Sequence, residues 1–319
     1  MKRVTVVIPC YNEEGNIDEF YKALKNLFLQ KLSQYNYTFL FIDNKSTDNS
    51  RAIIYQICKK DSNVRAIFNI RNFGSLNSPY YALCQADGDA VILISADFQD
   101  PIDIIPKFIE EWEKGAKVVC GVKNRSKENH LIYCLRTIYY KLIRKMSYVA
   151  TTDHFFGFGL YDRSFLEILK NLNDPLPYLR GIVAEYAPDR VEIPYEQENR
   201  RAGKSSNNWY SLYDSAMLSF TSYTKIGLRI FTFFGFFCAI VGFVIAFVYL
   251  ILKLLNMNQF VMGMAPVLIG LFIMGGIQLI FIGILGEYIL TINNRLINRP
   301  LVVEEERINF DTSCDSTAK

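Results

Sequence analysis

The sequence predicts an α/β domain with a doubly wound, mostly parallel sheet, followed by amphipathic helices and two membrane-spanning helices. Three observations predict this architecture. Short β-rich runs alternate with helix-length amphipathic segments between residues 3 and 121. These runs are apolar on both faces, as parallel strands covered by helices on each side should be. Apolar residues are then concentrated after Arg229, in two stretches that are nearly free of charge.

Five runs carry the strand pattern, and roughly helix-sized intervals separate them. They are "RVTVVIP" at 3–9, "YTFLFID" at 37–43, "VRAIFN" at 64–69, "AVILIS" at 90–95 and "AKVVCGV" at 116–122. Alternation of this kind favours strand–helix–strand units wound into one sheet. After residue 122 the pattern becomes helical and more basic.

Two later segments, 131–149 and 207–225, have the spacing of amphipathic helices. Such helices, when they are rich in aromatic residues and flanked by basic ones, suit a membrane interface. The alternative is that both are ordinary helices packed on the sheet domain. That alternative is stronger for the first segment than for the second, which leads directly into a hydrophobic stretch.

The two hydrophobic stretches are long enough to cross a membrane. Residues 230–252 contain no charge and residues 266–292 contain only Glu287, and each exceeds the ~20 residues needed to cross a bilayer core of about 30 Å. Basic residues before the first stretch and after the second predict that both chain ends face the cytoplasm. We therefore expect a domain at 1–205, an interface region at 206–228, a helical hairpin at 229–295 and a flexible polar cytoplasmic tail at 296–319.

Charge and cysteine content narrow the function classes. The net charge of +3 is too small to indicate nucleic acid as a partner. The seven cysteines form no Cys-x-x-Cys pair and have no histidine at metal-binding spacing, so they are expected to be reduced thiols in a cytosolic compartment. The N-terminus runs straight into a strand pattern without the apolar region of a signal peptide, which favours a cytoplasmic N-terminal domain.

Polar clusters stand at the ends of four predicted strands. They are Pro9 to Glu13, Asp43 with Asn44, Asn69 to Gly74, and Asp97 to Asp100. Ligands of open α/β sheets bind outside the carboxyl ends of the strands, so these clusters should meet at one edge. Each cluster alone also fits turn or helix-cap chemistry, but the four together indicate a ligand site.

The fourth cluster has the chemistry of a cation site that holds a diphosphate. The sequence has neither a P-loop nor a Gly-x-Gly-x-x-Gly turn after the first strand, so a glycine-rich phosphate cradle is not indicated. A carboxylate at a strand end can instead hold a hard divalent cation, Mg²⁺ or Mn²⁺, whose other sites take diphosphate oxygens. Asp97 with Gln99 fits that role. The alternative, in which Asp97 and Asp100 only cap a helix starting at Pro101, explains Asp100 better than Asp97.

The ordered motifs resemble those of the inverting family 2 glycosyltransferases with the GT-A fold. The motifs are "VTVVIPCYNEEGNI", "IDNKSTDNS", "RNFG" and "ADFQDP". The downstream "GFGLYDR", "YLRG" and "EIPYEQENRRAGKS", with the paired hydrophobic stretches, are similar to the polyprenyl-phosphate branch, which includes bactoprenol glucosyltransferases and dolichyl-phosphate mannose synthases. The resemblance covers roughly residues 3 to 300, and motifs in the right order over that length are far more specific than any one of them.

This resemblance implies roles for particular residues. Asp97, Gln99 and Asp100 form the expected catalytic set, with Asp97 and Gln99 at the metal. The residues expected to bind the donor are Pro9, Tyr11, Asn12, Glu13, Asp43, Arg71, Asn72, Gly74 and Ser95. The cations expected to bind the acceptor phosphate are Arg200, Arg201, Lys204 and Arg136, since guanidinium groups pair well with phosphate; for Arg136, a basic stripe facing anionic lipid headgroups is the simpler reading.

Two positions depart from the family pattern. Ser95 stands where the family has the first acid of Asp-x-Asp, and Gly157 stands where many relatives have an acid. A different sugar, weaker metal binding or lost activity would each be consistent with these departures. The reaction tolerates them in principle, because a lipid phosphate with a second pKa near ~6 is already largely anionic at neutral pH and needs no strong base.

The expected function is transfer of one hexose from a nucleotide-sugar, UDP-glucose first among them, to undecaprenyl phosphate at the cytoplasmic face of a bacterial plasma membrane. The product would be a lipid-linked sugar for cell-envelope glycan modification, and a flippase or a second copy of the chain could be partners. One alternative is a processive polysaccharide synthase, although the Gln-x-x-Arg-Trp motif of that branch is incomplete and two spans make a poor channel. The other alternative is a catalytically silent membrane scaffold of the same fold.

Overall fold

The computed structural model describes residues 1–125, 154–172, 174–198, 264–297 and 299–310, together with Thr152 and scattered positions between 217 and 251. In this part of the chain eight strands form one sheet in the order β7-β5-β6-β4-β1-β2-β3-β8. Their bounds are β1 Arg3–Cys10, β2 Asn36–Asp43, β3 Val64–Asn69, β4 Ala90–Leu93, β5 Val118–Arg125, β6 Phe155–Asp162, β7 Val191–Glu196 and β8 Glu304–Ile308.

The centre of the sheet is parallel, as predicted. β1 pairs in parallel with β2 and β4, and β2 pairs in parallel with β3. β6 is antiparallel to both of its neighbours, β4 and β5, while β5 and β7 are parallel. The five predicted strand runs correspond to β1 to β5, and the fold is the mostly parallel, GT-A-like α/β fold expected from the sequence.

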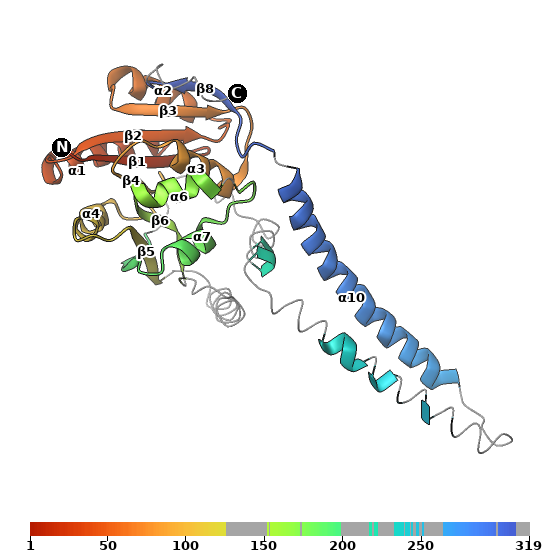
Figure 1. Ribbon diagram of the computed structural model, residues 1–319. Helices are drawn as coiled ribbons and strands as arrows, with labels where there is room; N and C mark the ends of the chain where they lie inside the picture. The colour runs from red at the N-terminus through yellow and green to blue at the C-terminus, as the bar shows by residue number, and fades with distance from the viewer. Residues whose placement is uncertain are drawn as a thin grey trace.

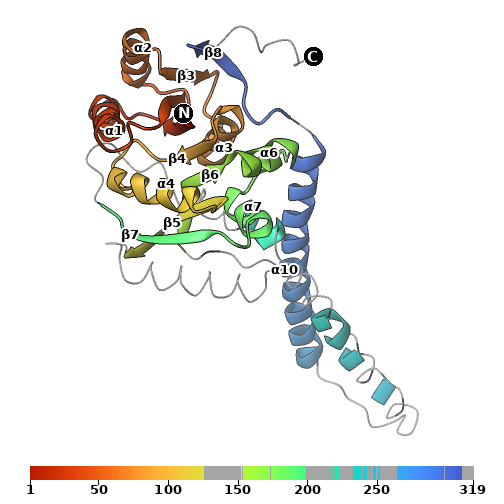
Figure 2. The same ribbon diagram turned by 60° about the vertical axis from the view of Figure 1, so that its left-hand side comes forward.

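Helices cover both faces of the sheet (Figures 1 and 2). α1, α2 and α4 pack on one face through residues such as Phe20, Ile54 and Phe108, and α3, α6 and α7 pack on the other through Leu83 and Phe165 among others. Alternate side chains of each strand therefore enter different cores. The helix bounds are α1 Ile17–Lys31, α2 Ser50–Lys60, α3 Gly74–Gln85, α4 Ile105–Glu113, α6 Arg163–Leu172, α7 Leu179–Tyr186 and α10 Met264–Leu296, with a 3₁₀ turn at Ile102–Ile104.

The reading of the chain after residue 122 as helical is wrong for β6 and β7. β6 contains two glycines, and Gly159 is required there because an added Cβ would lie 2.4 Å from the carbonyl oxygen of Val119 on β5. β7 contains Pro194, which lacks an N–H donor and is tolerated because β7 is an edge strand. These glycines and this proline weakened the strand signal in the sequence.

The expectation of a flexible tail is wrong for residues 304–308, which form β8 along the edge of β3. The strand reads as polar because three acids and an arginine occupy an edge position, where charged side chains are common. Arg51 binds both Glu305 (2.9 Å) and Glu306 (3.1 Å). The amide of Asn309 donates to the carbonyl oxygens of Cys58 (2.8 Å) and Val64 (2.7 Å), which fixes the strand end on the domain.

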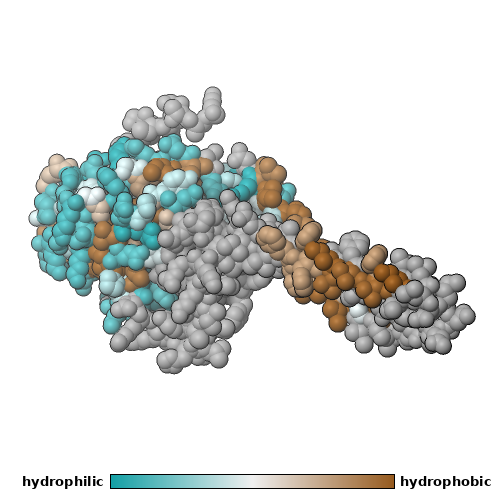
Figure 3. Space-filling view, turned by 60° about the horizontal axis from the view of Figure 1, so that its bottom comes forward, coloured by the Kyte–Doolittle hydropathy of each residue, from teal (hydrophilic) through white to brown (hydrophobic). Residues whose placement is uncertain are grey.

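α10 projects away from the α/β domain and presents an apolar surface along its length (Figure 3). Within it, Ile273–Leu296 is the one helix of the described residues that is long and apolar enough to cross a membrane, and none of it is buried. The predicted second hydrophobic stretch is thus a spanning candidate. Most of the first stretch, 230–252, lies outside the described residues, so a pair of spanning helices stays a prediction.

The described part of the preceding segment runs antiparallel to α10. The Phe220 ring meets the Tyr288 ring near the domain (6.2 Å between centroids), Thr221 and Thr291 hydroxyls lie 3.2 Å apart, and Phe234 meets Phe281 farther out (6.2 Å). From Phe220 to Phe234 the contacted ring on α10 changes from Tyr288 to Phe281, an earlier residue, so the two segments run in opposite directions. This pairing is the arrangement that a helical hairpin would have.

Removal of β8 tests the revised C-terminus. A variant that ends at Val303 should have a melting temperature at least about 5 °C below wild type, because exposing the β3 edge and losing the Arg51 ion pairs removes several favourable contacts and about 1 kcal/mol corresponds to a shift of 2–4 °C. Thermal unfolding of the detergent-purified protein would measure this. A variant that ends at Phe310, which keeps β8, is the matched control and should melt like wild type; equal melting of both variants would contradict the role of β8.

Candidate active site

The parallel pairing of β1, β2 and β3 brings three predicted polar clusters to one edge of the sheet. Cys10 at the end of β1 is level with Asp43 at the end of β2, which is level with Phe68 near the end of β3. The loops that follow these strands must therefore emerge side by side. The cluster after β4 emerges at the same edge, since β4 is parallel to β1.

Asn44 organises the loop that follows β3. Its side-chain amide donates to Asn72 Oδ1 (2.9 Å) and to the carbonyl oxygen of Gly74 (3.1 Å). Its side-chain oxygen accepts from the backbone of Phe73 (2.9 Å) and the amide of Asn69 (3.1 Å). Asn72 and Gly74, two predicted donor-site residues, are thus held by Asn44, which the sequence placed in the second polar cluster without a role of its own. Arg71 is exposed, and its guanidinium lies 4.1 Å from the ring centroid of Phe73.

Asn12 and Glu13 connect the β1 loop to the β2 loop. Asn12 has a positive φ of 57°, its backbone donates to Ser46 Oγ (2.9 Å), and its side chain accepts from the backbone of Thr47 (2.8 Å). The backbone of Glu13 donates to Ser50 Oγ (2.8 Å). The expected donor-binding residues therefore hold the shape of the loop pair, while Tyr11 stands exposed at its rim.

Asp43 is almost fully buried, and its carboxylate accepts from the backbone N–H of Ser46 (3.2 and 3.3 Å). Burial raises the pKa of Asp43, and the Ser46 hydrogen bonds oppose that rise. Carboxylates also gather around the neighbouring Cys10 thiol, whose pKa is raised by burial and then by Asp43, Glu13, Asp48 and Asp97. Asp97 is thus one of four carboxylates whose negative charge acts on Cys10, at the end of β1.

The turn after β4 separates Asp97 from Asp100. Phe98 has a positive φ of 58° and is buried with its ring against Phe20 (5.1 Å between centroids), which anchors the turn. The half-buried Asp97 accepts the backbone N–H of Gln99 (3.2 Å), and the Gln99 carbonyl accepts the backbone N–H of Glu198 (3.2 Å). The chain that leads into the predicted basic segment at 200–204 therefore passes this turn.

Asp100 points inward and accepts a hydrogen bond from the hydroxyl of Tyr195 on β7. The interpretation of Asp100 as a helix cap is wrong, because the 3₁₀ turn that follows has no side-chain cap. Burial raises the pKa of Asp100, while Lys123 and the Tyr195 hydrogen bond oppose the rise. Burial and Asp100 together raise the pKa of Tyr195, so its hydroxyl remains a donor.

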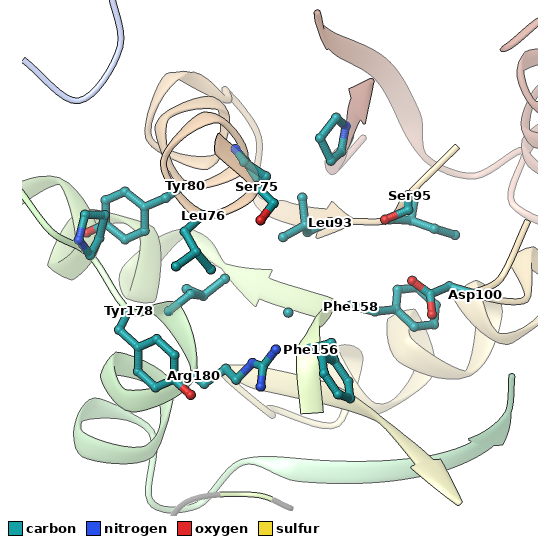
Figure 4. A pocket seen from close by; sticks show the side chains of 16 residues that line it. Ser75, Leu76, Tyr80, Leu93, Ser95, Asp100, Phe156, Phe158, Tyr178 and Arg180 are labelled. Atoms are coloured by element: carbon teal, nitrogen blue, oxygen red, sulfur yellow. The ribbon is translucent and has the colours of Figure 1, made fainter. Parts of the chain in front are cut away.

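Asp100 lines a cavity of about 120 Å³ beside the ends of β4 and β6 (Figure 4). This is smaller than the roughly 300–1,000 Å³ of pockets that enclose a drug-sized ligand, so it has room for part of a large substrate. Both positions that depart from the family pattern, Ser95 and Gly157, also line it. The remaining lining residues are Pro9, Ser75, Leu76, Pro79, Tyr80, Leu93, Ile94, Phe156, Phe158, Pro177, Tyr178, Leu179 and Arg180.

Two cations lie over one aromatic ring at this cavity, and sequence reasoning missed both. The Arg180 guanidinium is 4.1 Å and the Lys123 ammonium 4.6 Å from the centroid of Phe156. Arg180 comes from the first turn of α7, within the "YLRG" motif. That motif was the available signal, but only the position of α7 against β6 brings Arg180 to the cavity.

The predicted site residues thus fall into two neighbouring groups. Asn12, Glu13, Asp43, Arg71, Asn72 and Gly74 lie over β1 to β3, whereas Pro9, Ser95 and Asp100 line the cavity beside β4 and β6. Asp97 and Gln99 belong to the turn that follows β4, the strand beside β1. The predicted acceptor cations Arg136, Arg200, Arg201 and Lys204 lie outside the described residues.

Asp97 and Gln99 suit a cation that the substrate also helps to bind. Among the residues that the structure describes, no group of three or more His, Cys, Asp or Glu side chains could hold a metal ion by itself. Mg²⁺ is commonly bound by one or two carboxylates together with substrate phosphates. One carboxylate and one amide in a turn fit that mode, and they do not fit an all-protein metal cage.

An open parallel sheet whose strand ends carry polar loops and an adjoining cavity defines an α/β enzyme that binds its substrate at this edge. The family comparison is specific: Glycosyl transferase family 2 matches residues 5–169, which is more than half of the chain. The chain belongs to this family and is a glycosyltransferase.

Its curated relatives match nearly the whole chain. It is 33% identical to the SfII prophage-derived bactoprenol glucosyl transferase of Shigella flexneri, over 93% of this chain and 96% of that protein. It is 32% identical to the prophage bactoprenol glucosyl transferase homolog of Escherichia coli K12, over 90% of this chain and 93% of that protein. The mannosyltransferase PcManGT from Pyrobaculum calidifontis, solved with GDP-Man and Mn²⁺, is 17% identical over 72% of this chain and 64% of its own, with a TM-score of 0.47.

The buried charge of Asp43 gives a pH-dependent prediction. Because the pKa of Asp43 is raised in the folded state, this carboxyl group contributes less to stability as the pH rises from the ordinary aspartate pKa of about 3.9 through the raised value. Asp43→Asn removes this loss of stability at higher pH, because asparagine does not ionise. The melting temperature of the variant relative to wild type should therefore be higher at pH 8 than at pH 4.

Asp103→Asn is the control, because the Asp103 side chain is 90% exposed and should give no such trend. Thermal unfolding at both pH values measures the difference. A variant that is less stable than wild type at pH 8 and equally stable at pH 4 would mean that the Asp43 charge stabilises the fold.

Proposed function

We propose that this glycosyltransferase moves one hexose, with inversion, from a nucleotide-sugar to polyprenyl phosphate at the cytoplasmic face of a bacterial plasma membrane. UDP-glucose is the proposed donor and undecaprenyl phosphate the proposed acceptor. The names of the relatives, bactoprenol glucosyl transferases that align over 90% or more of this chain, support the sugar and the lipid. The product would be a lipid-linked sugar for modification of the cell envelope.

One structural observation supports a lipid acceptor. α7 lines the cavity with Leu179 and Arg180 in its first turn, and its later residues Glu185 and Tyr186 form a second hollow together with Arg295 at the end of α10. A single short helix thus joins the candidate site to the base of the membrane-spanning candidate. An acceptor whose phosphate lies at the membrane surface could reach this cavity while its chain stays in the bilayer.

The donor is proposed to lie across the two groups of site residues. The nucleoside would bind at the loops after β1, β2 and β3, near Asp43 and Arg71, and the hexose would enter the cavity that Ser95 and Asp100 line. Asp97 and Gln99 would hold a divalent cation, which when bound neutralises charge on the departing diphosphate. The acceptor phosphate would be met by the basic segment at 200–204, which begins two residues after the hydrogen bond of Glu198 to Gln99.

The proposed chemistry needs alignment more than proton transfer. An oxygen of the lipid phosphate forms the new bond to the anomeric carbon as the bond from that carbon to the diphosphate oxygen breaks on the opposite side, which inverts the configuration. The phosphate monoester is already largely anionic at neutral pH, so no residue has to remove a proton from it. The contribution of the protein is to hold the reacting atoms in line.

The proposed membrane topology has two spanning helices with both chain ends in the cytoplasm. The contacts of Phe220, Thr221 and Phe234 with α10 support it. The interface role of residues 206–228, a flippase partner and a homo-oligomer stay predictions of the sequence.

The function is tested with purified full-length protein, a panel of labelled sugar nucleotides and polyprenyl phosphate. Wild type should form a lipid that carries one sugar, with UDP-glucose as the best donor, and chelation of divalent cations should abolish the product. Asp97→Asn should reduce the rate at least about 100-fold, while Asp103→Asn, an exposed acid six residues away, should leave it unchanged. Long polymer would favour a processive synthase, and the absence of both nucleotide release and labelled lipid would contradict the proposal.

A further inference from the structure

We propose that Arg180, held on the ring of Phe156, is a further cation that binds the acceptor phosphate, from inside the cavity and in addition to the basic segment at 200–204. This inference rests on the proposed function and adds to it a binding residue within the described part of the chain. Three features of the structure support it: the position of Arg180 in the cavity, the aromatic residues beside it, and the path of α7 to the end of α10.

Arg180 is placed where a phosphate entering the cavity would meet it. Figure 4 shows its guanidinium facing the cavity beside Phe156, across from Ser95. Among the described residues that line the cavity, Arg180 is the one with a permanent positive charge and Asp100 the one acid. Asp100 accepts a hydrogen bond from Tyr195, which stabilises its charge from the side of β7.

The aromatic neighbours of Arg180 restrict its orientation. The guanidinium lies 4.1 Å from the centroid of Phe156 and 6.0 Å from that of Tyr178. A guanidinium that lies over an aromatic face is restricted in orientation, and its N–H groups point outward in the plane of the guanidinium. Such an edge can bind two oxygens of one phosphate, which gives both charge and direction.

The sheet order separates this cation from the nucleoside side of the site. β4 and β1 lie between β6, which carries Phe156, and β2, which ends at Asp43. Arg71, the exposed cation of the donor group, follows β3 on the far side of β2. Arg180 therefore faces the part of the substrate that is away from the nucleoside, which is the sugar and whatever attacks it.

The path of α7 connects Arg180 to the membrane. Arg180 and Tyr186 are six residues apart, so they are separated by roughly 9 Å along the helix axis. Tyr186, Glu185 and Ile182 line the second hollow with Arg295, whose guanidinium contacts Asp174 (3.4 Å) and Ser222 (3.3 Å). A phosphate bound at Arg180 would thus lie close to the end of α10, as the head of a membrane-held lipid must.

The experiment compares wild type, Arg180→Gln and Arg180→Lys in full-length protein. Arg180→Gln should raise the KM for polyprenyl phosphate at least tenfold and leave the KM for the nucleotide-sugar within twofold of wild type. The KM of Arg180→Lys for polyprenyl phosphate should fall between the values of wild type and Arg180→Gln, because lysine keeps the charge and loses the bidentate geometry. Arg163→Gln, which removes an exposed arginine that pairs with Glu167 on α6, is the control and should leave both KM values unchanged.

A readout without the lipid separates this inference from the proposed function. A soluble alkyl phosphate should bind wild type, measured by calorimetry, and bind Arg180→Gln at least tenfold more weakly. If wild type forms no glycolipid but this difference in binding is found, the proposed function fails and the anion site stands. The assignment of Arg180 is overturned if glycolipid forms and Arg180→Gln raises the KM for the nucleotide-sugar instead of that for polyprenyl phosphate. It is also overturned if glycolipid forms and the variant changes neither KM.

The role of Phe156 gives a second variant that keeps the charge. Phe156→Leu should raise the KM for polyprenyl phosphate by less than Arg180→Gln and should leave folding intact, because Phe156 is 38% exposed. Unchanged acceptor kinetics in this variant would show that stacking does not position the guanidinium.

Discussion

The parallel pairing of β4, β1, β2 and β3 is the constraint on which the candidate site depends. Hydrogen bonds between these strands fix which residues are level with each other, and so they fix where each following loop leaves the sheet. Once the strand ends share an edge, short polar contacts can join loops that are distant in sequence, as Asn44 joins the β2 loop to the loop after β3. A shift of register in any pair would separate these partners.

The second half of the site depends on a strand that runs the other way. β6 enters the sheet antiparallel between β4 and β5, and its first residues, Phe156 and Gly157, therefore lie at the same edge as the last residues of β4. α7 then packs on β6 and closes the cavity with Tyr178 and Arg180. The polar loops after β1 to β3 and the cavity beside β6 are thus built from two different strand directions that meet at one edge of the sheet.

This division explains how much of the protein could be predicted from the sequence. β1 to β5 were predictable because they are apolar runs, and the meeting of the polar loops followed from the rule that parallel strand ends share an edge. β6 and β7 were missed because Gly159 and Pro194 reflect contacts with neighbouring strands that no local pattern reveals. Arg180 was missed, and Asn44 was placed in a polar cluster without its role as the link between two loops, for the same reason: the importance of both lies in what packs beside them. Asp100 was predicted at the site, but its contact with Tyr195 is 95 residues away in sequence.

The position of β8 also constrains the order in which the protein can be completed. The strand that covers the edge of β3 is encoded after the membrane segment, so the ribosome releases it only when α10 has already been made. During synthesis the edge of β3 therefore stays unpaired until α10 and the residues that follow it have been made. Pairing of β8 with β3 thus ties the chain on both sides of α10 to the same α/β domain, so the base of this helix is held at two points.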